Sequence, residues 1–270
     1  MAKRFLLLIL IFSIYFECVG QTAADYYKSG LEKSNWGDKQ GAIRDYNKAI
    51  EINPNYAEAY YCRAHAKFAI SDMEGAILDF NKLIEINPKD SETYNVRGQA
   101  KLKLGDKEGA IMDYNKAIEI NPNYAQAYNN RGYVKLTNND AKGAITDFNK
   151  AIEISPQFSA AYANRGKAKY NMHNIGASIL DFNKAIELDP DDAIAHICRG
   201  EANYSLGNYN EALEDYTKTI KFLPNNATAY YNRGNTKFRL GDKEGACSDW
   251  SKASELGSAD AGSSIAEHCK

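Results

Sequence analysis

The prolines of this chain all fall on one lattice. They occupy positions 54, 88, 122, 156, 190 and 224, so that each lies 34 residues after the one before it. A regular period of this length indicates an array of identical structural units. A unit this short cannot bury its apolar side alone, so neighbouring units must stack on one another. The lattice divides the chain into seven segments: 23–56, 57–90, 91–124, 125–158, 159–192, 193–226 and 227–260.

Other residue types follow the same period. The fourth position of each segment is tyrosine except at His196, and the eighth is glycine or alanine. The twentieth is alanine except at Ser178, the twenty-fourth is aromatic throughout, and the twenty-seventh is alanine except at Leu83 and Thr219. Small residues at fixed positions allow two helices to approach closely, and the aromatic residues then fill the space toward the next unit.

Each segment carries the signals of two helices. The first is expected over roughly fourteen positions, because Gly or Asn then follows, as at Gly37, Gly105, Asn139, Gly207 and Gly241. Asp or Asn comes next as the predicted N-cap of the second helix: Asp38, Asp72, Asp106, Asp140, Asn174, Asn208 and Asp242. Apolar residues in the second half recur at helical spacing, and the lattice proline ends the helix. The pattern therefore predicts an all-α chain.

This combination resembles the tetratricopeptide-repeat family, whose 34-residue helix–turn–helix unit has an aromatic, a small residue, alanine, an aromatic, alanine and proline in that order. The resemblance covers residues 23 to 260. It implies an all-α solenoid, a right-handed superhelix of helix–turn–helix repeats. His196, Ser178 and Thr219 depart from the pattern, as does Ala259, which stands where a further proline would fall.

Residues 258–269 predict a short capping helix, because the open end of a solenoid needs a polar outer face. Cys247 lies on the second helix of the last repeat and Cys269 near the end of this cap. Two antiparallel helices could bring these cysteines into a disulfide, but spacing alone does not fix the connectivity, and both could equally be free thiols. Cys62 and Cys198 lie four repeats apart, too far to pair with each other.

Residues 1–20 resemble a signal peptide. Lys3 and Arg4 precede a largely apolar run from Phe5 to Phe16, and Gly20 offers a cleavage site before Gln21. We therefore expect an exported protein, periplasmic or secreted, with a bacterial type of leader. The alternatives are an uncleaved anchor, for which the run is short, and a lipoprotein modified at Cys18, where Glu17 is a poor match.

In this family the first helices line the concave groove of the superhelix, so the resemblance places partner-binding residues there. The positions concerned are aromatic and amide-rich with little charge; the candidates are Tyr61, Phe68, Asn95, Asn129, Asn130, Tyr133, Asn164, Lys167, Tyr170, Tyr204, Tyr231, Asn232 and Phe238. An asparagine amide supplies both a donor and an acceptor for a peptide backbone. The alternative is that these asparagines only follow the family consensus and that some aromatics pack against the next repeat.

A second ladder combines arginine and aspartate. Arginine occupies the seventh position in the second to seventh repeats, and aspartate the twenty-third position in all seven. We expect charge-assisted hydrogen bonds between the two rows. Pairing within a repeat would leave Asp45 over, and pairing to the next repeat would leave Asp249 over. A row of arginines that binds anions is the functional alternative.

The remaining features narrow the function. A formal net charge of -2 without a basic run argues against nucleic acid as the partner. The four histidines form no zinc motif, and no Cys-x-x-Cys pair, phosphate loop or nucleophile elbow is present. We therefore expect no catalytic residue, metal or cofactor, and a scaffold that binds a protein or an extended peptide. A groove for a glycan or cell-wall fragment and an architectural role in an envelope assembly remain open, as does the oligomeric state.

Overall fold

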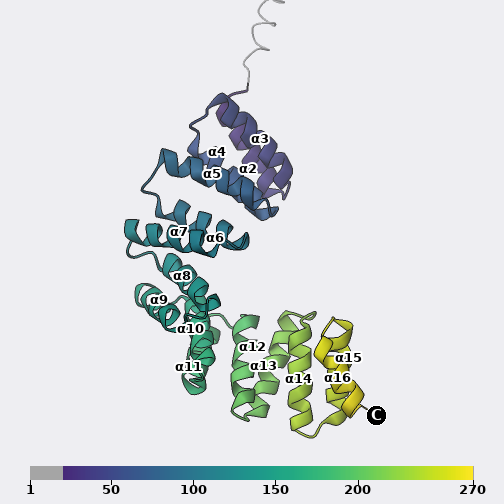
Figure 1. Cartoon of the computed structure of the whole chain (residues 1–270). Coiled ribbons are helices and arrows are strands. Elements are labelled where there is room, and N and C mark those ends of the chain that lie inside the picture. The colour runs from purple at the N-terminus through teal and green to yellow at the C-terminus, as the bar shows by residue number, and fades with distance from the viewer. Residues whose placement is uncertain (1–20, 270) are drawn as a thin grey trace, which may run out of the picture. The chain divides into compact units, whose positions relative to one another are not determined.

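The computed structural model describes residues 21–269, so the predicted signal peptide and Cys18 lie outside the described residues. Within this part the chain forms helices and no strand (Figure 1). The helices are α2 (Ala23–Asn35), α3 (Lys39–Ile52), α4 (Ala57–Ala69), α5 (Met73–Ile86), α6 (Ser91–Lys103), α7 (Lys107–Ile120), α8 (Ala125–Thr137), α9 (Ala141–Ile154), α10 (Ser159–Asn171), α11 (Ile175–Leu188), α12 (Ala193–Ser205), α13 (Tyr209–Phe222), α14 (Ala227–Arg239), α15 (Lys243–Glu255) and α16 (Ala259–His268).

Each 34-residue segment forms one pair of helices, α2 with α3 through to α14 with α15. The predicted fold class is therefore confirmed, with α16 as an additional helix at the C-terminal end. The chain divides into two compact units after Asp113, inside α7. The first unit extends from α2 into α7, and the second continues from there to α16.

The turns inside the repeats need a left-handed backbone. Gly37, Gly105, Gly207 and Gly241 have φ values from 81° to 88°, a region that glycine enters without steric cost. Ser71, Asn139 and His173 adopt the same conformation with φ of 61° to 65°. Sequence patterns identified the glycines and Asn139 as helix breakers, but gave no sign that serine and histidine fill the same role.

Aspartates begin most of the second helices as predicted. The carboxylates of Asp38, Asp72, Asp106, Asp140 and Asp242 each accept a hydrogen bond from the backbone N–H three residues later. Such a cap satisfies a donor that the helix leaves open. Asn174 and Asn208 hold the same N-cap position but form no side-chain capping bond. These two positions therefore follow the repeat without supplying its capping interaction.

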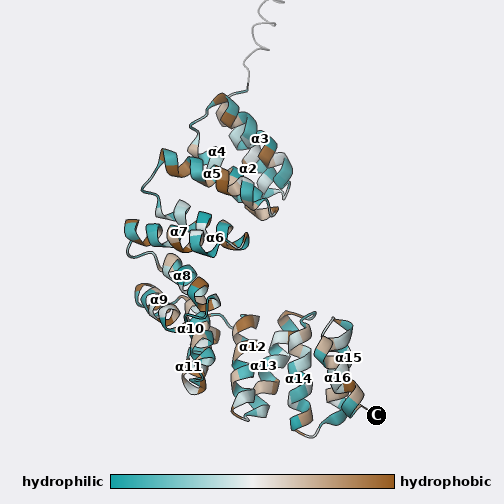
Figure 2. Ribbon diagram, viewed as in Figure 1, coloured by the Kyte–Doolittle hydropathy of each residue, from teal (hydrophilic) through white to brown (hydrophobic). Residues whose placement is uncertain are grey.

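Small residues face large ones across each helix pair. A Cβ atom added to Gly166 would lie 2.7 Å from the Phe182 ring, and one added to Gly234 would lie 2.7 Å from the Trp250 ring. Phe182 and Trp250 are themselves almost wholly buried. The two helices of each pair can therefore approach closely only because glycine has no side chain at this position. Both hydrophobic and hydrophilic residues occur along the helices, as expected for helices with one buried side (Figure 2).

The arginine and aspartate ladders pair within each repeat. Arg131 binds Asp147 with both ends of its guanidinium group, at 2.9 Å from Nε to Oδ2 and 2.6 Å from Nη2 to Oδ1. The other pairs are Arg63–Asp79, Arg97–Asp113, Arg165–Asp181, Arg199–Asp215 and Arg233–Asp249. Asp45 is left over, as pairing within the repeat requires, and Lys33 and Ser29 bind it instead. Since each of these guanidinium groups is bound to a carboxylate, we assign the row a structural role and not the binding of external anions.

The same arginines also join consecutive repeats. In five repeats, Nη1 of the ladder arginine donates to the side-chain oxygen of an asparagine sixteen residues earlier, in the second helix of the preceding repeat. These arginines are Arg63, Arg97, Arg131, Arg165 and Arg199.

In the sixth repeat, the ladder aspartate has a different second partner. The buried ring of His196 lies 3.0 Å from Asp215 through Nδ1 and 3.0 Å from the Pro190 carbonyl through Nε2. Asp215 therefore has histidine as its second partner, where other repeats use lysine.

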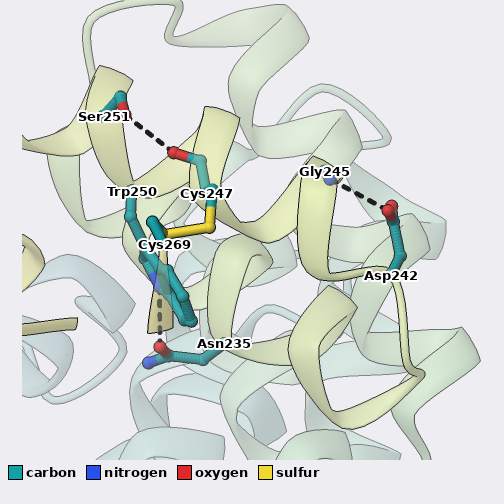
Figure 3. The surroundings of a disulfide bond; sticks show 7 residues. All are labelled: Asn235, Asp242, Gly245, Cys247, Trp250, Ser251 and Cys269. Atoms are coloured by element: carbon teal, nitrogen blue, oxygen red, sulfur yellow. Dashed lines mark hydrogen bonds between the residues drawn. A yellow bond between two sulfur atoms is a disulfide. The ribbon is translucent and has the colours of Figure 1, made fainter. Parts of the chain in front are cut away.

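The C-terminal end is closed by α16, which packs against α15. The structure contains a disulfide between Cys247 of α15 and Cys269, with the two Cα atoms 5.7 Å apart. Figure 3 shows the indole of Trp250 next to this disulfide, and its Nε1 donates to Asn235 Oδ1 at 2.9 Å. The buried Ala261 places α16 against the same cluster. This arrangement covers the apolar side of the last repeat.

Candidate functional site

The first helices of successive repeats contact one another. In the first unit α2 contacts α4; in the second, α8, α10, α12 and α14 contact one another in succession. The exposed side of these helices in each unit is called here the first-helix face. Every residue of the predicted binding site belongs to one of these helices or to α6.

Aromatic side chains of the second unit lie on this face in different environments. Tyr133 of α8 is 44% exposed. Tyr170 of α10 is half-buried, and its hydroxyl lies 2.9 Å from Ser205 Oγ on α12. Tyr204 packs edge-on against Tyr209. The half-buried Tyr231 contacts the core of the last repeat. These side chains present surface to a partner while being held by their neighbours.

Phe238 behaves differently from the other predicted aromatics. Its ring centroid lies 5.6 Å from that of Trp250 and 4.5 Å from that of His268 on α16. These contacts make it part of the C-terminal cap. In the first unit, Phe68 packs against the core cluster that includes Phe80, with the Lys103 ammonium 5.5 Å from its ring. Both phenylalanines therefore contribute to packing between elements.

The predicted asparagines form a network that is mostly internal. Asn95 and Asn129 are only 2% and 6% exposed, so they offer almost no surface to a partner. Nδ2 of Asn164 donates to Oδ1 of Asn129 at 3.0 Å, which joins α8 to α10. Asn232 lies 3.5 Å from Glu201, and Asn130 is half-buried. The bond between Asn129 and Asn164 links two first helices, and Asn130, Asn164 and Asn232 keep part of their surface exposed.

The second unit has a cavity of about 230 Å³ between α10 and α12. Lys167 and Tyr170 line it from α10, and Ile197, Cys198 and Glu201 line it from α12. Burial raises the pKa of the Glu201 carboxyl, an effect that Lys167 and the hydrogen bond from Asn232 oppose. Burial also raises the pKa of the Cys198 thiol to about 12, so this cysteine is not a nucleophile at neutral pH. The cavity thus combines an apolar wall with one charge of each sign.

The first unit has a larger cavity, of about 390 Å³, beside Tyr61. Tyr61 is half-buried and its hydroxyl donates to Glu92 Oε1 at 2.8 Å. Its ring lies 4.4 Å from the ring of His65. Of the predicted site residues, only Tyr61 lines this cavity, together with residues of α2, α4 and α5.

Sequence reasoning did not identify Glu58, Asp90, Cys198 or Glu201 as site residues, although all four line cavities. One available signal was departure from the repeat. Cysteine stands at the sixth position in two repeats where three others have asparagine, and Glu201 is the only carboxylate at the ninth position. Positions that break a strong structural pattern are expected to be functional or strained.

Two further features can be stated for residues 21–269. No group of three or more His, Cys, Asp or Glu side chains in this range is arranged to hold a metal ion. No helix in the same range is long and apolar enough to cross a membrane.

Stacked helix pairs, with a first-helix face in each unit, define a helical-repeat protein. Family models identify which kind. A TPR-repeat model matches residues 37–71, 98–139, 174–207 and 202–241, and a second tetratricopeptide-repeat model matches residues 57–90 and 125–158. The chain therefore belongs to the tetratricopeptide-repeat family.

Solved structures of similar proteins have the same fold. The MamA protein is 30% identical, with a TM-score of 0.57 over 65% of this chain and 96% of its own. A tetratricopeptide-repeat protein from Parabacteroides merdae ATCC 43184 is 22% identical, with a TM-score of 0.70 over 89% of this chain and 95% of its own. YrrB, described as a TPR protein with an unusual peptide-binding site, is 25% identical, with a TM-score of 0.53 over 66% of this chain and 92% of its own.

Among curated proteins, the uncharacterized protein MJ0572 of Methanocaldococcus jannaschii is 49% identical over 41 residues. The match covers 15% of this chain and about half (48%) of that protein. It extends over little more than one repeat and carries no argument about function.

Proposed function

We propose that this protein is a non-catalytic scaffold that binds an extended peptide segment of a partner protein on its first-helix face. The observation that supports this proposal most directly is the surface of α8, α10 and α12. There Tyr133 of α8 is exposed, and the exposed Lys167 lines a cavity together with Tyr170 and Ile197. Tyrosine is a favoured residue at protein interfaces because its ring is rigid and its hydroxyl can form a hydrogen bond.

The chemistry of the cavity in the second unit suits a peptide. A peptide backbone offers both donors and acceptors, and Glu201 and Lys167 supply the complementary groups next to apolar walls. The similar protein YrrB is described as having an unusual peptide-binding site. These points favour a peptide over a glycan or a cell-wall fragment.

We further propose that the protein acts outside the cytoplasm. The signal-peptide pattern of residues 1–20 supports this location. The disulfide between Cys247 and Cys269 supports it separately, because such bonds persist in oxidising compartments and are rare where thiols are kept reduced.

The proposal is tested with residues 21–270 immobilised and exposed to a random-peptide phage library and, in parallel, to an array of glycans and peptidoglycan fragments. The test variant combines Tyr133→Ser with Lys167→Ala, which changes two exposed side chains and leaves the buried asparagine network intact. The matched control combines Leu180→Ser with Lys184→Ala on α11, outside the first-helix face.

Enrichment of peptides by the wild type and the control, with loss in the test variant, is the expected result. Binding to glycans alone would replace the peptide with a sugar as the ligand. Peptides captured equally by all three proteins would move the binding surface away from the first-helix face and favour an architectural role.

A further inference from the structure

We infer that the cavity of the first unit receives the side chain of a lysine or arginine from a peptide segment that binds the first-helix face of that unit. This inference rests on the proposed function, because it assigns a specificity pocket to the same kind of surface. The cavity measures about 390 Å³, which is within the range of small-ligand pockets. It can therefore hold a long side chain together with part of the backbone beside it.

The inner wall of the cavity is apolar and aromatic. Leu83 and Ile86 of α5 both line it; Leu83 is buried and Ile86 is 37% exposed. Tyr27 and Cys62 lie side by side, with the tyrosine hydroxyl 3.8 Å from Cys62 Sγ. Tyr61 completes the lining from α4. Such a wall fits the aliphatic part of a lysine or arginine side chain, and aromatic rings attract its cationic end.

The opening carries negative charge. Glu58, in the first turn of α4, and Asp90, the N-cap of α6, both line the cavity. A third carboxylate, Glu92, binds the hydroxyl of Tyr61. None of the residues that line this cavity in the described part of the chain is basic. Asp90 accepts hydrogen bonds from the backbone N–H of Glu92 and from the Thr93 hydroxyl, but no lining side chain neutralises its charge or that of Glu58. The opening is therefore complementary to a cation.

Two tyrosines that line the cavity, Tyr27 and Tyr61, have raised pKa values. Burial is the largest of the effects that raise the pKa of Tyr27 to about 12. A hydrogen bond with Cys62 and the proximity of Cys62, Tyr56 and Glu58 add to it. Burial, the hydrogen bond to Glu92 and the nearby Asp90 raise the pKa of Tyr61 as well. Burial disfavours a charge of either sign, so the part of these shifts that favours a cation is the part due to the carboxylates of Glu58, Glu92 and Asp90.

The lining residues also break the repeat. Cys62 occupies a position where three other repeats have asparagine, and Leu83 one where five others have alanine. The scaffold itself does not need these residues, since the remaining repeats fold without them. Glu58 has a counterpart only in Glu92 of the next repeat, so the acidic opening belongs to this part of the chain alone.

The test uses residues 21–270 and the random-peptide library. The variant Glu58→Gln/Asp90→Asn removes both charges at the opening, and asparagine can still cap α6. The matched control is Asp72→Asn/Glu74→Gln, which also removes an N-cap carboxylate and a first-turn glutamate, in this case from α5. Thermal melting of both variants checks that they are equally folded.

The wild type and the control should enrich peptides that share a lysine or arginine at one position, and the cavity variant should lose that preference. In fluorescence anisotropy, an enriched peptide should bind the cavity variant about tenfold more weakly than the wild type. Replacing the basic residue of the peptide with methionine should weaken binding to the wild type by a similar factor. Added salt should weaken the original complex and leave the methionine peptide almost unaffected.

The outcomes separate the two proposals. If no peptide is enriched by the wild type, the proposed function itself is wrong. If peptides are enriched without a shared basic residue, or if the cavity variant keeps the preference, peptide binding stands and the assignment of this cavity is overturned. A loss of affinity equal in the control variant would also overturn it.

Discussion

At the scale of single residues, stability depends on a carboxylate that is buried once in every repeat. The seven aspartates of the ladder are between 0% and 6% exposed. In five repeats, arginine and lysine bind the two oxygens of this carboxylate together, as Arg131 and Lys135 bind Asp147. A buried charge is tolerated only when it is paired and hydrogen-bonded. The ladder therefore explains why arginine and aspartate recur at fixed positions of the repeat.

Replacing Arg131 with leucine should destabilise the protein. The change removes both bonds to Asp147 and the bond to Asn115 of the preceding repeat. Loss of one partner of a buried ion pair typically costs 3–5 kcal/mol, but Lys135 still holds one oxygen of Asp147. We expect a loss of about 2 kcal/mol in the free energy of unfolding, measured by urea denaturation.

The control for Arg131→Leu is Lys150→Gln, which removes an exposed pair with Glu153 on α9. Exposed pairs contribute little, so this change should stay within about 0.5 kcal/mol of the wild type. Equal unfolding curves for Arg131→Leu and the wild type would contradict a structural role for the ladder.

Glu201 gives a prediction for pH. Because burial raises its pKa, the folded protein binds this proton more tightly than the unfolded chain does. The stability it contributes is present below the ordinary glutamate pKa of about 4.3 and is lost as the pH rises through the higher folded value. Glu201→Gln should therefore raise the melting temperature at pH 7, and the gain should shrink to nothing near pH 4.

The melting temperatures of Glu201→Gln and the wild type are compared by circular dichroism between pH 4 and pH 8. Glu211→Gln, a change at an exposed glutamate of α13, serves as the control. A gain for Glu201→Gln that does not depend on pH would show that ionisation is not its cause. Glu201 is thus a destabilising carboxylate that lines the same cavity as Lys167. This placement is consistent with a role in binding.

At the scale of helices, the C-terminal cap depends on a covalent bond. The helix α16 has only ten residues and one buried residue, Ala261. A helix this short is not stable alone in water. The disulfide joins Cys247 and Cys269, which lie 22 positions apart in the sequence, and a loop of this size corresponds to about 3 kcal/mol of stabilisation.

Cys269→Ser should therefore release α16 without unfolding the earlier repeats. Hydrogen exchange followed by mass spectrometry should show lost protection in α16 and part of α15, with α12 and α13 unchanged. Dithiothreitol should reproduce this effect in the wild type and have none on the variant. Cys198→Ser, a change at a free thiol, is the control. Undiminished protection of α16 in Cys269→Ser would show that packing alone holds the cap.

Helix positions follow more directly from the sequence than the residues of a binding site do. Helix positions follow from Gly, Pro and Asp at fixed places, because these residues act on the backbone next to them. The site depends instead on which side chains meet across repeats. The amide of Asn129 is buried against Asn164, although both occupy positions that face the groove in the family. No local rule distinguishes a buried amide from an exposed one, or shows that Glu58 and Asp90 line one cavity.

At the scale of the whole molecule, each repeat contacts mainly its neighbours. Stability in such an array is close to a sum of terms for single repeats and for the interfaces between adjacent ones. Destabilisation of one repeat should then extend to its neighbours only as far as the interfaces between repeats transmit it. Phe148 offers a place to test this, because it is fully buried in α9 and packs with Ala168 of the next repeat.

Phe148→Ala should lower protection in a graded way along the second unit. The lost ring leaves a cavity that costs about 3–5 kcal/mol at this position. Hydrogen exchange should increase most in α8, α9 and α10, less in α12, and least in α15, where the disulfide-bonded cap is far along the chain. The matched change Tyr46→Ala in the first repeat should affect α2, α3 and α4 and leave the second unit unchanged. Equal loss of protection from α8 to α15 would show instead that the second unit unfolds cooperatively and that its repeats do not unfold independently.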